Sequence, residues 1–307
     1  MSKKIIMLDA SALSLSACTY KLWMTTVEGY KPKLSTINIE VGTAFHKFRN
    51  IIREEGPSAF PKACVEAKQH LATAEYAPTT KYNAYLADPV YLMRVCSEYM
   101  IKYEHDNLQP LHLEMRFCFP FYVDDYVEVL IAGTIDEIGK LDSGIFVLCD
   151  CKTTSAANAK DKLASYLLSN QLMFYYWVLK LYGQQFPDTS IGEVCAGDIA
   201  IMIDGVFFRG KEKVEFERSE YWLPPRWITD EYARVITQKI TNLCTEFSRH
   251  IKAGTVPAKD GLVHNVCTLF NKCDYFYHCS AVDEFVADVM LKRHLVQKHY
   301  NPLNHQT

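Results

Sequence analysis

Residues 131–152 read IAGTIDEIGKLDSGIFVLCDCK, two apolar segments joined by a turn at residues 141–144, LDSG. The pattern predicts two strands, and side chains alternate faces along a strand, so Asp150 and Lys152 project to the same side. In the first segment the alternating apolar positions share one face, which leaves Asp136 on the opposite face. If the two strands form a hairpin, Asp136 converges with the Asp150/Lys152 pair.

Charge at the end of an apolar sheet needs a partner, because unpaired charge there is costly. Two aspartates supply the oxygen ligands that Mg²⁺ or Mn²⁺ prefers, and a lysine can hold an attacking water or offset charge on a phosphate. The alternative is a buried ion pair between Lys152 and one aspartate, since charge clusters mark functional sites only statistically. This stretch alone leaves both interpretations open.

The composition predicts a folded protein with a substantial core, because 49% of the 307 residues are hydrophobic. A net charge of -3 neither supports nor excludes nucleic-acid binding, so a polyanion would have to meet a local basic patch. Eleven scattered cysteines are unlike the framework of a small disulfide-linked secreted protein. A reducing, cytoplasmic location is therefore expected, in the host cytoplasm if the protein is encoded by a phage.

The first 18 residues, MSKKIIMLDASALSLSAC, need a check because their end is similar to a bacterial lipoprotein cleavage site. Asp9 interrupts the apolar run, and Ser11 and Ser14 dilute it further, so we do not expect a signal peptide. Modification at Cys18 is the alternative. Later segments do not approach the roughly 20 apolar residues that a membrane span requires, so no membrane partner is expected.

A helix is predicted at residues 41–53, VGTAFHKFRNIIR, where the apolar positions follow helical spacing. Gly42 lets another backbone or a ligand approach the face that carries His46 one turn later. Taken alone, His46 is more often a hydrogen-bonded structural histidine than a ligand. Further helices are predicted at residues 14–24, 62–76 and 83–106.

Residues 111–123, LHLEMRFCFPFYV, alternate as a strand and place His112, Glu114, Arg116 and Cys118 on one face. Glu114 is either a third acid near Asp136 and Asp150 or the partner of Arg116.

A long helix is predicted at residues 163–182, with Gln171 and Tyr175 one turn apart on the same face. A short loop joins it to the lysine-bearing strand, so Gln171 is expected over Asp150 and Lys152. Two more strands are predicted at residues 191–203 and 206–216, around a hairpin at Asp204-Gly205. A long helix at residues 230–253, a cysteine-rich loop and a last helix at residues 281–298 follow.

Five short segments, taken in order, resemble the PD-(D/E)XK nuclease superfamily and, within it, the RecB-like branch. They are GTAFH (42–46), the strand with Glu114, GTIDE (133–137), DCK (150–152) and QLMFY (171–175). The resemblance covers about Cys18 to Cys279. It implies an α/β fold with a restriction-endonuclease-like core, in which helices flank a central mixed β-sheet.

The resemblance also implies a role for each matching residue. His46, Asp136 and Asp150 would bind Mg²⁺ or Mn²⁺, helped by the backbone carbonyl of Cys151. Lys152 would orient or activate the attacking water and stabilise the charge that develops on the phosphate. Gln171 and Tyr175 would assist the active centre and contact the DNA backbone, and Glu114 stands where some members carry an additional acid.

Four cysteines carry a second resemblance, to the iron–sulfur members of this branch, such as the AddB nuclease domain and the CRISPR-associated adaptation nucleases. Cys18, Cys267, Cys273 and Cys279 would hold a [4Fe–4S] cluster that ties the two chain ends together. Five residues separate Cys267 from Cys273, where those families usually have two. Zn²⁺, with His264 or His278 as a further ligand, is therefore an alternative, and so is no metal at all.

The sequence thus predicts a single nuclease domain, 1–307, with a helical N-terminal part (1–110), a nuclease core (111–254) and a cysteine-rich segment with a final helix (255–307). We expect a metal-dependent DNA exonuclease that acts on DNA ends or single strands in recombination, repair or CRISPR adaptation. A recombination, helicase or CRISPR protein would be its partner. The alternative is a non-catalytic nucleic-acid-binding or assembly protein that retains the fold, although a decayed site would be free to lose the DCK and GTIDE charges.

Overall fold

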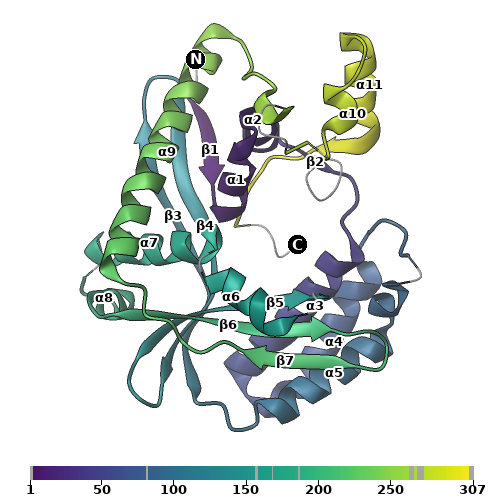
Figure 1. The fold of residues 1–307 in the computed structure, drawn as a ribbon, viewed down its shortest axis with the longest axis vertical. Coiled ribbons are helices and arrows are strands. Elements are labelled where there is room, and N and C mark those ends of the chain that lie inside the picture. Colours follow the sequence, from purple (N-terminus) through teal and green to yellow (C-terminus); the bar gives the residue numbers. More distant parts are fainter. Residues whose placement is uncertain are drawn as a thin grey trace. The chain divides into compact units, whose positions relative to one another are not determined.

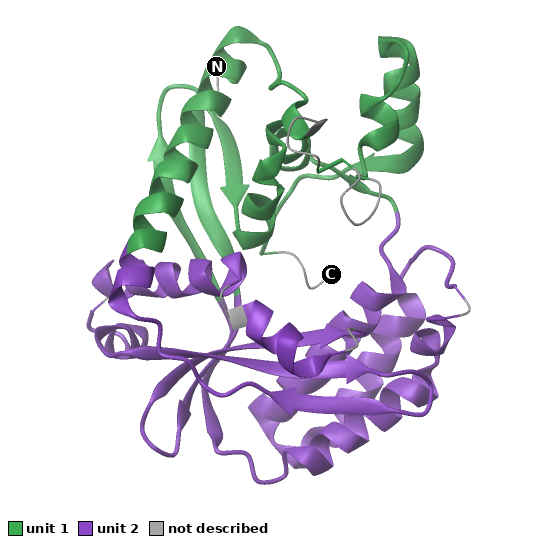
Figure 2. Ribbon diagram, in the orientation of Figure 1, with its two compact units in different colours: residues 1–33, 116–134, 231–307 green, residues 34–115, 135–230 purple. Residues whose placement is uncertain are grey.

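The computed structural model describes residues 3–80, 82–155, 158–167, 169–185, 187–262, 266–267 and 273–303. The chain divides into two compact units (Figure 2). Unit 1 consists of Met1–Lys33, Arg116–Thr134 and Glu231–Thr307, and unit 2 of Leu34–Met115 and Ile135–Asp230. Neither unit coincides with one of the three consecutive parts expected from the sequence, and the single nuclease domain stays a prediction.

Three elements, labelled in Figure 1, continue from one unit of Figure 2 into the other, namely β3 (Leu108–Val123), β4 (Val127–Leu141) and α9 (Arg226–Ala253). The other elements of unit 1 are β1 (Lys4–Leu8), α1 (Ala10–Ser14), η1 (Leu15–Ala17), α2 (Thr19–Thr26), β2 (Tyr30–Pro32), η4 (Asp260–Leu262), α10 (Phe276–Cys279), α11 (Glu284–His294) and β8 (Leu295–Gln297). In this unit β1 pairs in parallel with the first half of β4, and β2 pairs antiparallel with β8. No helix of the described residues is long and apolar enough to cross a membrane.

Unit 2 holds the second half of β4 and most of the helices. Its elements are α3 (Ile37–Glu55), η2 (Pro57–Ala59), α4 (Phe60–Thr73), η3 (Ala84–Ala87), α5 (Pro89–Lys102), β5 (Phe146–Thr154), α6 (Ala159–Leu167), α7 (Asn170–Gln185), α8 (Ser190–Ala196), β6 (Ile199–Phe208) and β7 (Val214–Arg218). The hydrogen-bonded strand order is β1-β4-β5-β6-β7, with β3 also paired to β4. Parallel and antiparallel pairs both occur, which confirms the predicted mixed sheet flanked by helices.

The hairpin predicted within residues 131–152 is present. Residues 137–140 of β4 pair antiparallel with residues 146–149 of β5, in a register that sets Glu137 opposite Cys149. Gly144 closes the turn with φ +89°, a backbone conformation that glycine adopts without steric cost. The register, continued by one residue, brings Asp136 level with Asp150.

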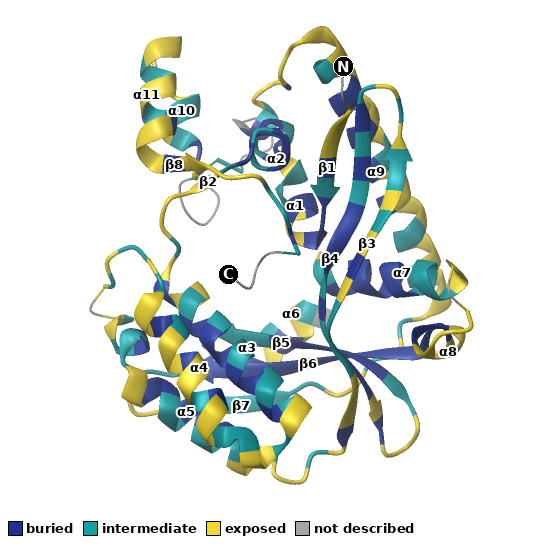
Figure 3. Cartoon of the chain, turned by 180° about the vertical axis from the view of Figure 1, so that it is seen from behind, coloured by how far each residue is buried: buried dark blue, intermediate teal, exposed yellow. Residues whose placement is uncertain are grey.

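Helices α3, α4 and α5 form the larger apolar cluster of unit 2 together with β6. The cluster includes Phe45 and Phe48 of α3, which are fully buried, and Val206 and Phe208 of β6. Strand β6 is buried along its whole length (Figure 3). A strand that is covered on both faces reads as a continuous apolar run, which is the pattern of its first five residues, IAIMI.

The predicted hairpin at Asp204-Gly205 is wrong, because β6 runs straight through this dipeptide and turns back only before β7. Asp204 is fully buried and accepts hydrogen bonds from Arg49 and from the Tyr99 hydroxyl. These distant partners satisfy a charge that the local rule would place in an exposed turn. The predicted strand at 191–203 also fails in its first half, which forms helix α8.

The single helix predicted at residues 163–182 is also wrong, because two helices, α6 and α7, cover this range. Gln171 therefore lies in the first turn of α7. Residues 4–8, KIIML, form strand β1, which the sequence pattern did not predict.

Candidate active site

Helix α3 carries His46 to the strands of the hairpin. A Cβ atom added to Gly42 would lie 2.6 Å from Thr153 Oγ1, so a side chain here would require Thr153 or the helix to shift. The close approach expected at Gly42 is thus to the chain's own strand. His46, one turn after Gly42, lies with its Nδ1 3.6 Å from Asp136 Oδ2.

Asp136 is held from two sides. In addition to the His46 ring, the backbone N–H of Cys151 donates a hydrogen bond of 3.1 Å to Asp136 Oδ2. This bond joins β4 to β5 just beyond their paired residues. The Asp136 side chain is 17% exposed and that of His46 is 26% exposed, so both can meet a ligand from solvent.

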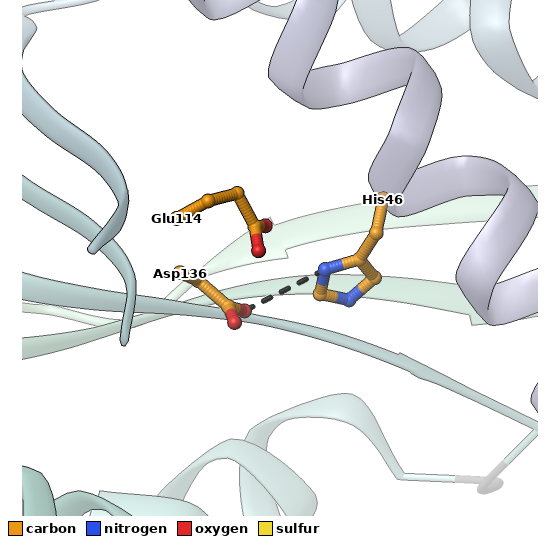
Figure 4. A group of neighbouring side chains, drawn as sticks. All are labelled: His46, Glu114 and Asp136. Carbon is orange, nitrogen blue, oxygen red and sulfur yellow. Dashed lines mark ion pairs between the residues drawn. The ribbon is translucent and has the colours of Figure 1, made fainter. Parts of the chain in front are cut away.

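Glu114 completes a group of three side chains that point toward one another (Figure 4). One ligand atom each from His46, Glu114 and Asp136 can be chosen so that all lie within 4.8 Å of one another. The strand β3 presents Glu114 in the left-handed region, with φ 47°. Of the two interpretations of Glu114 that the sequence left open, a third acid beside Asp136 fits this geometry.

Asp150 and Lys152 form an ion pair directly beside this group. Lys152 Nζ lies 2.7 Å from Asp150 Oδ2 and donates a hydrogen bond of 2.8 Å to Gln171 Oε1. Gln171 Nε2 in turn donates to the Tyr175 hydroxyl at 3.1 Å. The structure thus brings Gln171 to Lys152 as expected, although helix α6 lies between β5 and the helix that carries Gln171.

Burial raises the pKa of Asp150, which is only 1% exposed; the Asp136 carboxylate raises it further, while Lys152 opposes the shift. Burial alone would lower the pKa of Lys152, but the Asp150 and Asp136 carboxylates outweigh it and raise the pKa of this lysine. Lys152 is therefore protonated at neutral pH. Asp150 Oδ1 is buried and has no hydrogen-bond partner among the described residues.

These observations fit a divalent cation. Three oxygen or nitrogen donors converge, as Mg²⁺ and Mn²⁺ sites require, and a buried carboxylate oxygen beside them lacks a partner. The convergent group differs from the predicted ligand set, because Glu114 belongs to it, whereas Asp150 faces Lys152. Ligation by Asp150 and by the Cys151 carbonyl stays a prediction.

A buried ion cluster that the sequence analysis missed lies one residue along β4. Glu137 is fully buried, and its two carboxylate oxygens accept from Arg49 and Arg53 of α3. Arg49 also pairs with Asp204 of β6. The spacing of His46, Arg49 and Arg53, which lie on one face of one helix, is a sequence signal for this cluster.

The four cysteines of the second predicted site all belong to unit 1, where they line one cavity of about 70 Å³. A Cβ atom added to Gly261 would lie 2.9 Å from Cys18 Sγ and 3.2 Å from Cys267 Sγ. The backbone N–H of Cys273 donates to the Cys267 carbonyl at 2.9 Å. Burial raises the pKa of Cys279 to about 11, Lys259 opposes the shift, and the other three thiols add to it.

Of the two histidines expected as alternative zinc ligands, one lies in the described part of the chain. His264 lies outside the described residues. His278 has both ring nitrogens engaged, Nε2 with the Tyr20 hydroxyl at 2.6 Å and Nδ1 with the Ala287 carbonyl at 3.0 Å. A neutral imidazole bound in this way has no nitrogen left for a metal.

The model of the PD-(D/E)XK nuclease superfamily matches residues 10–280. The match covers most of the chain and includes the whole candidate site, so the protein belongs to this superfamily of nucleases. Membership implies a nucleic-acid substrate and a hydrolytic reaction that depends on a divalent metal.

No curated protein matches the sequence. Among solved structures, the chain is similar to one described as a "Putative exonuclease" from Eubacterium rectale, with 10% identity and a TM-score of 0.43 over 92% of this chain and 89% of that chain. A likeness this distant does not bear on activity.

Proposed function

We propose that the protein is a Mg²⁺- or Mn²⁺-dependent deoxyribonuclease, an exonuclease that hydrolyses phosphodiester bonds at DNA ends or in single strands. The observation that carries the proposal is the convergence of His46, Glu114 and Asp136 beside the Asp150–Lys152 pair. The resemblance of five sequence segments to the RecB-like branch supports a role in recombination, repair or CRISPR adaptation, with DNA as the partner.

Each side chain has a distinct task in this proposal. His46, Glu114 and Asp136 hold the metal, with Asp150 and the Cys151 carbonyl as further ligands. When bound, the metal supplies Lewis-acid stabilisation of the phosphate charge and lowers the pKa of a water nucleophile. Lys152 orients the water and offsets negative charge, and Gln171 fixes the lysine ammonium through its 2.8 Å hydrogen bond. Tyr175 supports Gln171 and contacts the DNA backbone.

The test is Mn²⁺-dependent degradation of end-labelled single- and double-stranded DNA by the full chain. Asp136→Asn, Asp150→Ala and Lys152→Ala should each abolish degradation, while Asp188→Asn, at an exposed position of the same unit, should retain it. Undiminished degradation in the three site variants refutes the proposal. Metal-independent DNA binding without cleavage would support the non-catalytic alternative instead.

For the second site, we propose a [4Fe–4S] cluster bound by Cys18, Cys267, Cys273 and Cys279. Four thiols around one cavity form the donor set that such clusters use. Zn²⁺ bound by the same thiols is the alternative, and metal analysis distinguishes the two.

The cluster is tested by anaerobic purification, a visible absorption spectrum and iron and zinc analysis. The broad visible absorption of an iron–sulfur cluster, together with about four iron atoms per chain, supports the proposal. Stoichiometric zinc without colour, or neither metal, contradicts it. Cys96→Ser, at a buried cysteine in the apolar cluster of unit 2, is the control, and its metal content should equal that of the unaltered protein.

A further inference from the structure

We propose that Asn50 is a positioning residue for the metal site, whose side-chain amide holds Glu114 beside His46 and Asp136. Its Nδ2 donates a hydrogen bond of 2.5 Å to Glu114 Oε1. The proposal deepens the proposed function and rests on it, because it assumes that the group of three binds a metal.

The spacing on α3 places Asn50 where this task requires it. His46 and Asn50 are four residues apart, so they lie on the same face of the helix, one turn from each other. His46 reaches Asp136 of β4, and Asn50 reaches Glu114 of β3. One helical face thereby brings a side chain to an acid on each of two neighbouring strands.

The strained backbone of Glu114 explains why its side chain needs a hydrogen bond from another element. Among the described residues it is the only one other than glycine with a positive φ, 47°. An L-residue in the left-handed region is strained, and such strain persists only where surrounding contacts impose it. The hydrogen bond to a charged carboxylate is of the strong, charge-assisted kind, and it opposes relaxation of the strand.

An amide suits this position better than a cation. Arg53, one turn further along α3, neutralises the carboxylate that it holds, Glu137. An amide instead donates a hydrogen bond and leaves the charge of Glu114 in place for a metal. Donors that hold ligands in this way tune metal affinity by about 10- to 100-fold in known sites.

The oxygen atom of the Asn50 amide distinguishes a positioning role from a purely structural one. Asn50 Oδ1 is buried and has no hydrogen-bond partner among the described residues. Burying an unpaired oxygen lowers stability, so a residue chosen for packing alone would be apolar at this position. Asn50→Leu, which keeps the branching and the number of side-chain heavy atoms, should therefore leave the melting temperature unchanged or higher while it weakens metal binding.

The experiment measures Mn²⁺ affinity of the full chain by electron paramagnetic resonance, together with its melting temperature in the absence of metal. Asn50→Leu and Glu114→Gln should each raise the Mn²⁺ dissociation constant by about tenfold or more. In the Glu114→Gln background, Asn50→Leu should cause no further loss, because its partner is already changed. Asn242→Leu, at an exposed asparagine of α9, is the control and should bind Mn²⁺ like the unaltered protein.

Two results overturn the inference. If Asn50→Leu lowers the melting temperature and leaves Mn²⁺ affinity intact, Asn50 is structural. If Glu114→Gln binds Mn²⁺ normally while Asp136→Asn does not, Glu114 is no ligand and Asn50 has none to position, although the proposed nuclease stands. Normal binding in Asp136→Asn as well would remove the metal site itself, and the proposed function with it.

Discussion

Asp150 is the most deeply buried acid of the candidate site, and Lys152 is its only charged partner within ion-pair distance in the described part of the chain. Breaking a buried pair by removing one partner leaves the other charge uncompensated, which costs on the order of 3 kcal/mol. Asp150 and Lys152 therefore contribute to stability as a pair, so the effect of substituting one depends on whether the other is still charged.

Lys152→Met should lower the free energy of unfolding by roughly 3 kcal/mol, because Asp150 stays buried without its cation. Asp150→Asn/Lys152→Met should recover most of this loss, since the double variant buries no net charge. Urea unfolding of the two variants measures the difference, and both should lack nuclease activity. A double variant that is less stable than Lys152→Met would show that the pair is not the source of the effect.

Asp204 differs from Asp150 in having cationic partners strong enough to overcome burial. Burial raises the pKa of Asp204, but Arg49 and Arg218 outweigh it, so the pKa lies below its ordinary value. A carboxyl group with a depressed pKa in the folded state contributes stability above its unfolded pKa of about 3.9. That contribution is lost as the pH falls below this value toward the folded pKa.

Asp204→Asn should therefore lower stability at pH 7 by about 3 kcal/mol, because Arg49 and Arg218 each lose one of their carboxylate partners. The deficit relative to the unaltered protein should shrink as the pH falls below about 4, where the native carboxyl begins to be protonated. Urea midpoints at neutral and acidic pH check the trend. An equal deficit at both pH values would contradict the linkage, and Asp188→Asn should show no deficit at either.

Sequence periodicity could predict the positions of Asp136, Asp150 and Lys152, because alternation along two strands and a short turn are local properties. The same local rules mispredicted Asp204-Gly205. Its turn preference is overridden by Arg49, which is 155 residues away in the chain. Asn50, Glu137 and the strained φ of Glu114 were missed for the same reason, since their roles exist only through contacts between elements.

At the scale of elements, the candidate site depends on how closely α3 lies on β5. Gly42 is the contact point, with Thr153 Oγ1 occupying the space that a side chain would need. Arg49 and Arg53 clamp the same helix to β4 through Glu137. His46 lies between these two anchors, so a small shift of the helix would move its ring away from Asp136.

Gly42→Ala should lower activity by about 10- to 100-fold, because a contact at 2.6 Å forces α3 away from β5 and small misplacements of reacting groups are costly. Gly42→Ala/Thr153→Ala removes the obstructing oxygen and should restore most of the activity. End-labelled DNA degradation and Mn²⁺ affinity measure the recovery. The explanation fails if the double variant is no more active than Gly42→Ala.

At the scale of the whole molecule, the two candidate sites belong to different units. His46, Glu114, Asp136, Asp150 and Lys152 belong to unit 2, and the four cysteines belong to unit 1. The cysteines come from the N-cap of α2 and from residues 267–279, so a cluster would join segments about 250 residues apart in the chain. The sequence could predict which cysteines belong together only through a family resemblance, since their spacing departs from the usual one.

Cys273→Ser should lose the cluster and lower the melting temperature, because metal binding in such a site is coupled to the folding of the segments that supply its ligands. Mn²⁺ affinity should stay within about twofold of the unaltered protein, since every ligand of that site lies in the other unit. The comparison requires anaerobically purified protein, iron analysis, a melting curve and an Mn²⁺ titration on the same preparation. A variant that loses iron and Mn²⁺ affinity together would mean that the two units are energetically coupled. Unchanged iron content would instead remove Cys273 from the ligands of the cluster.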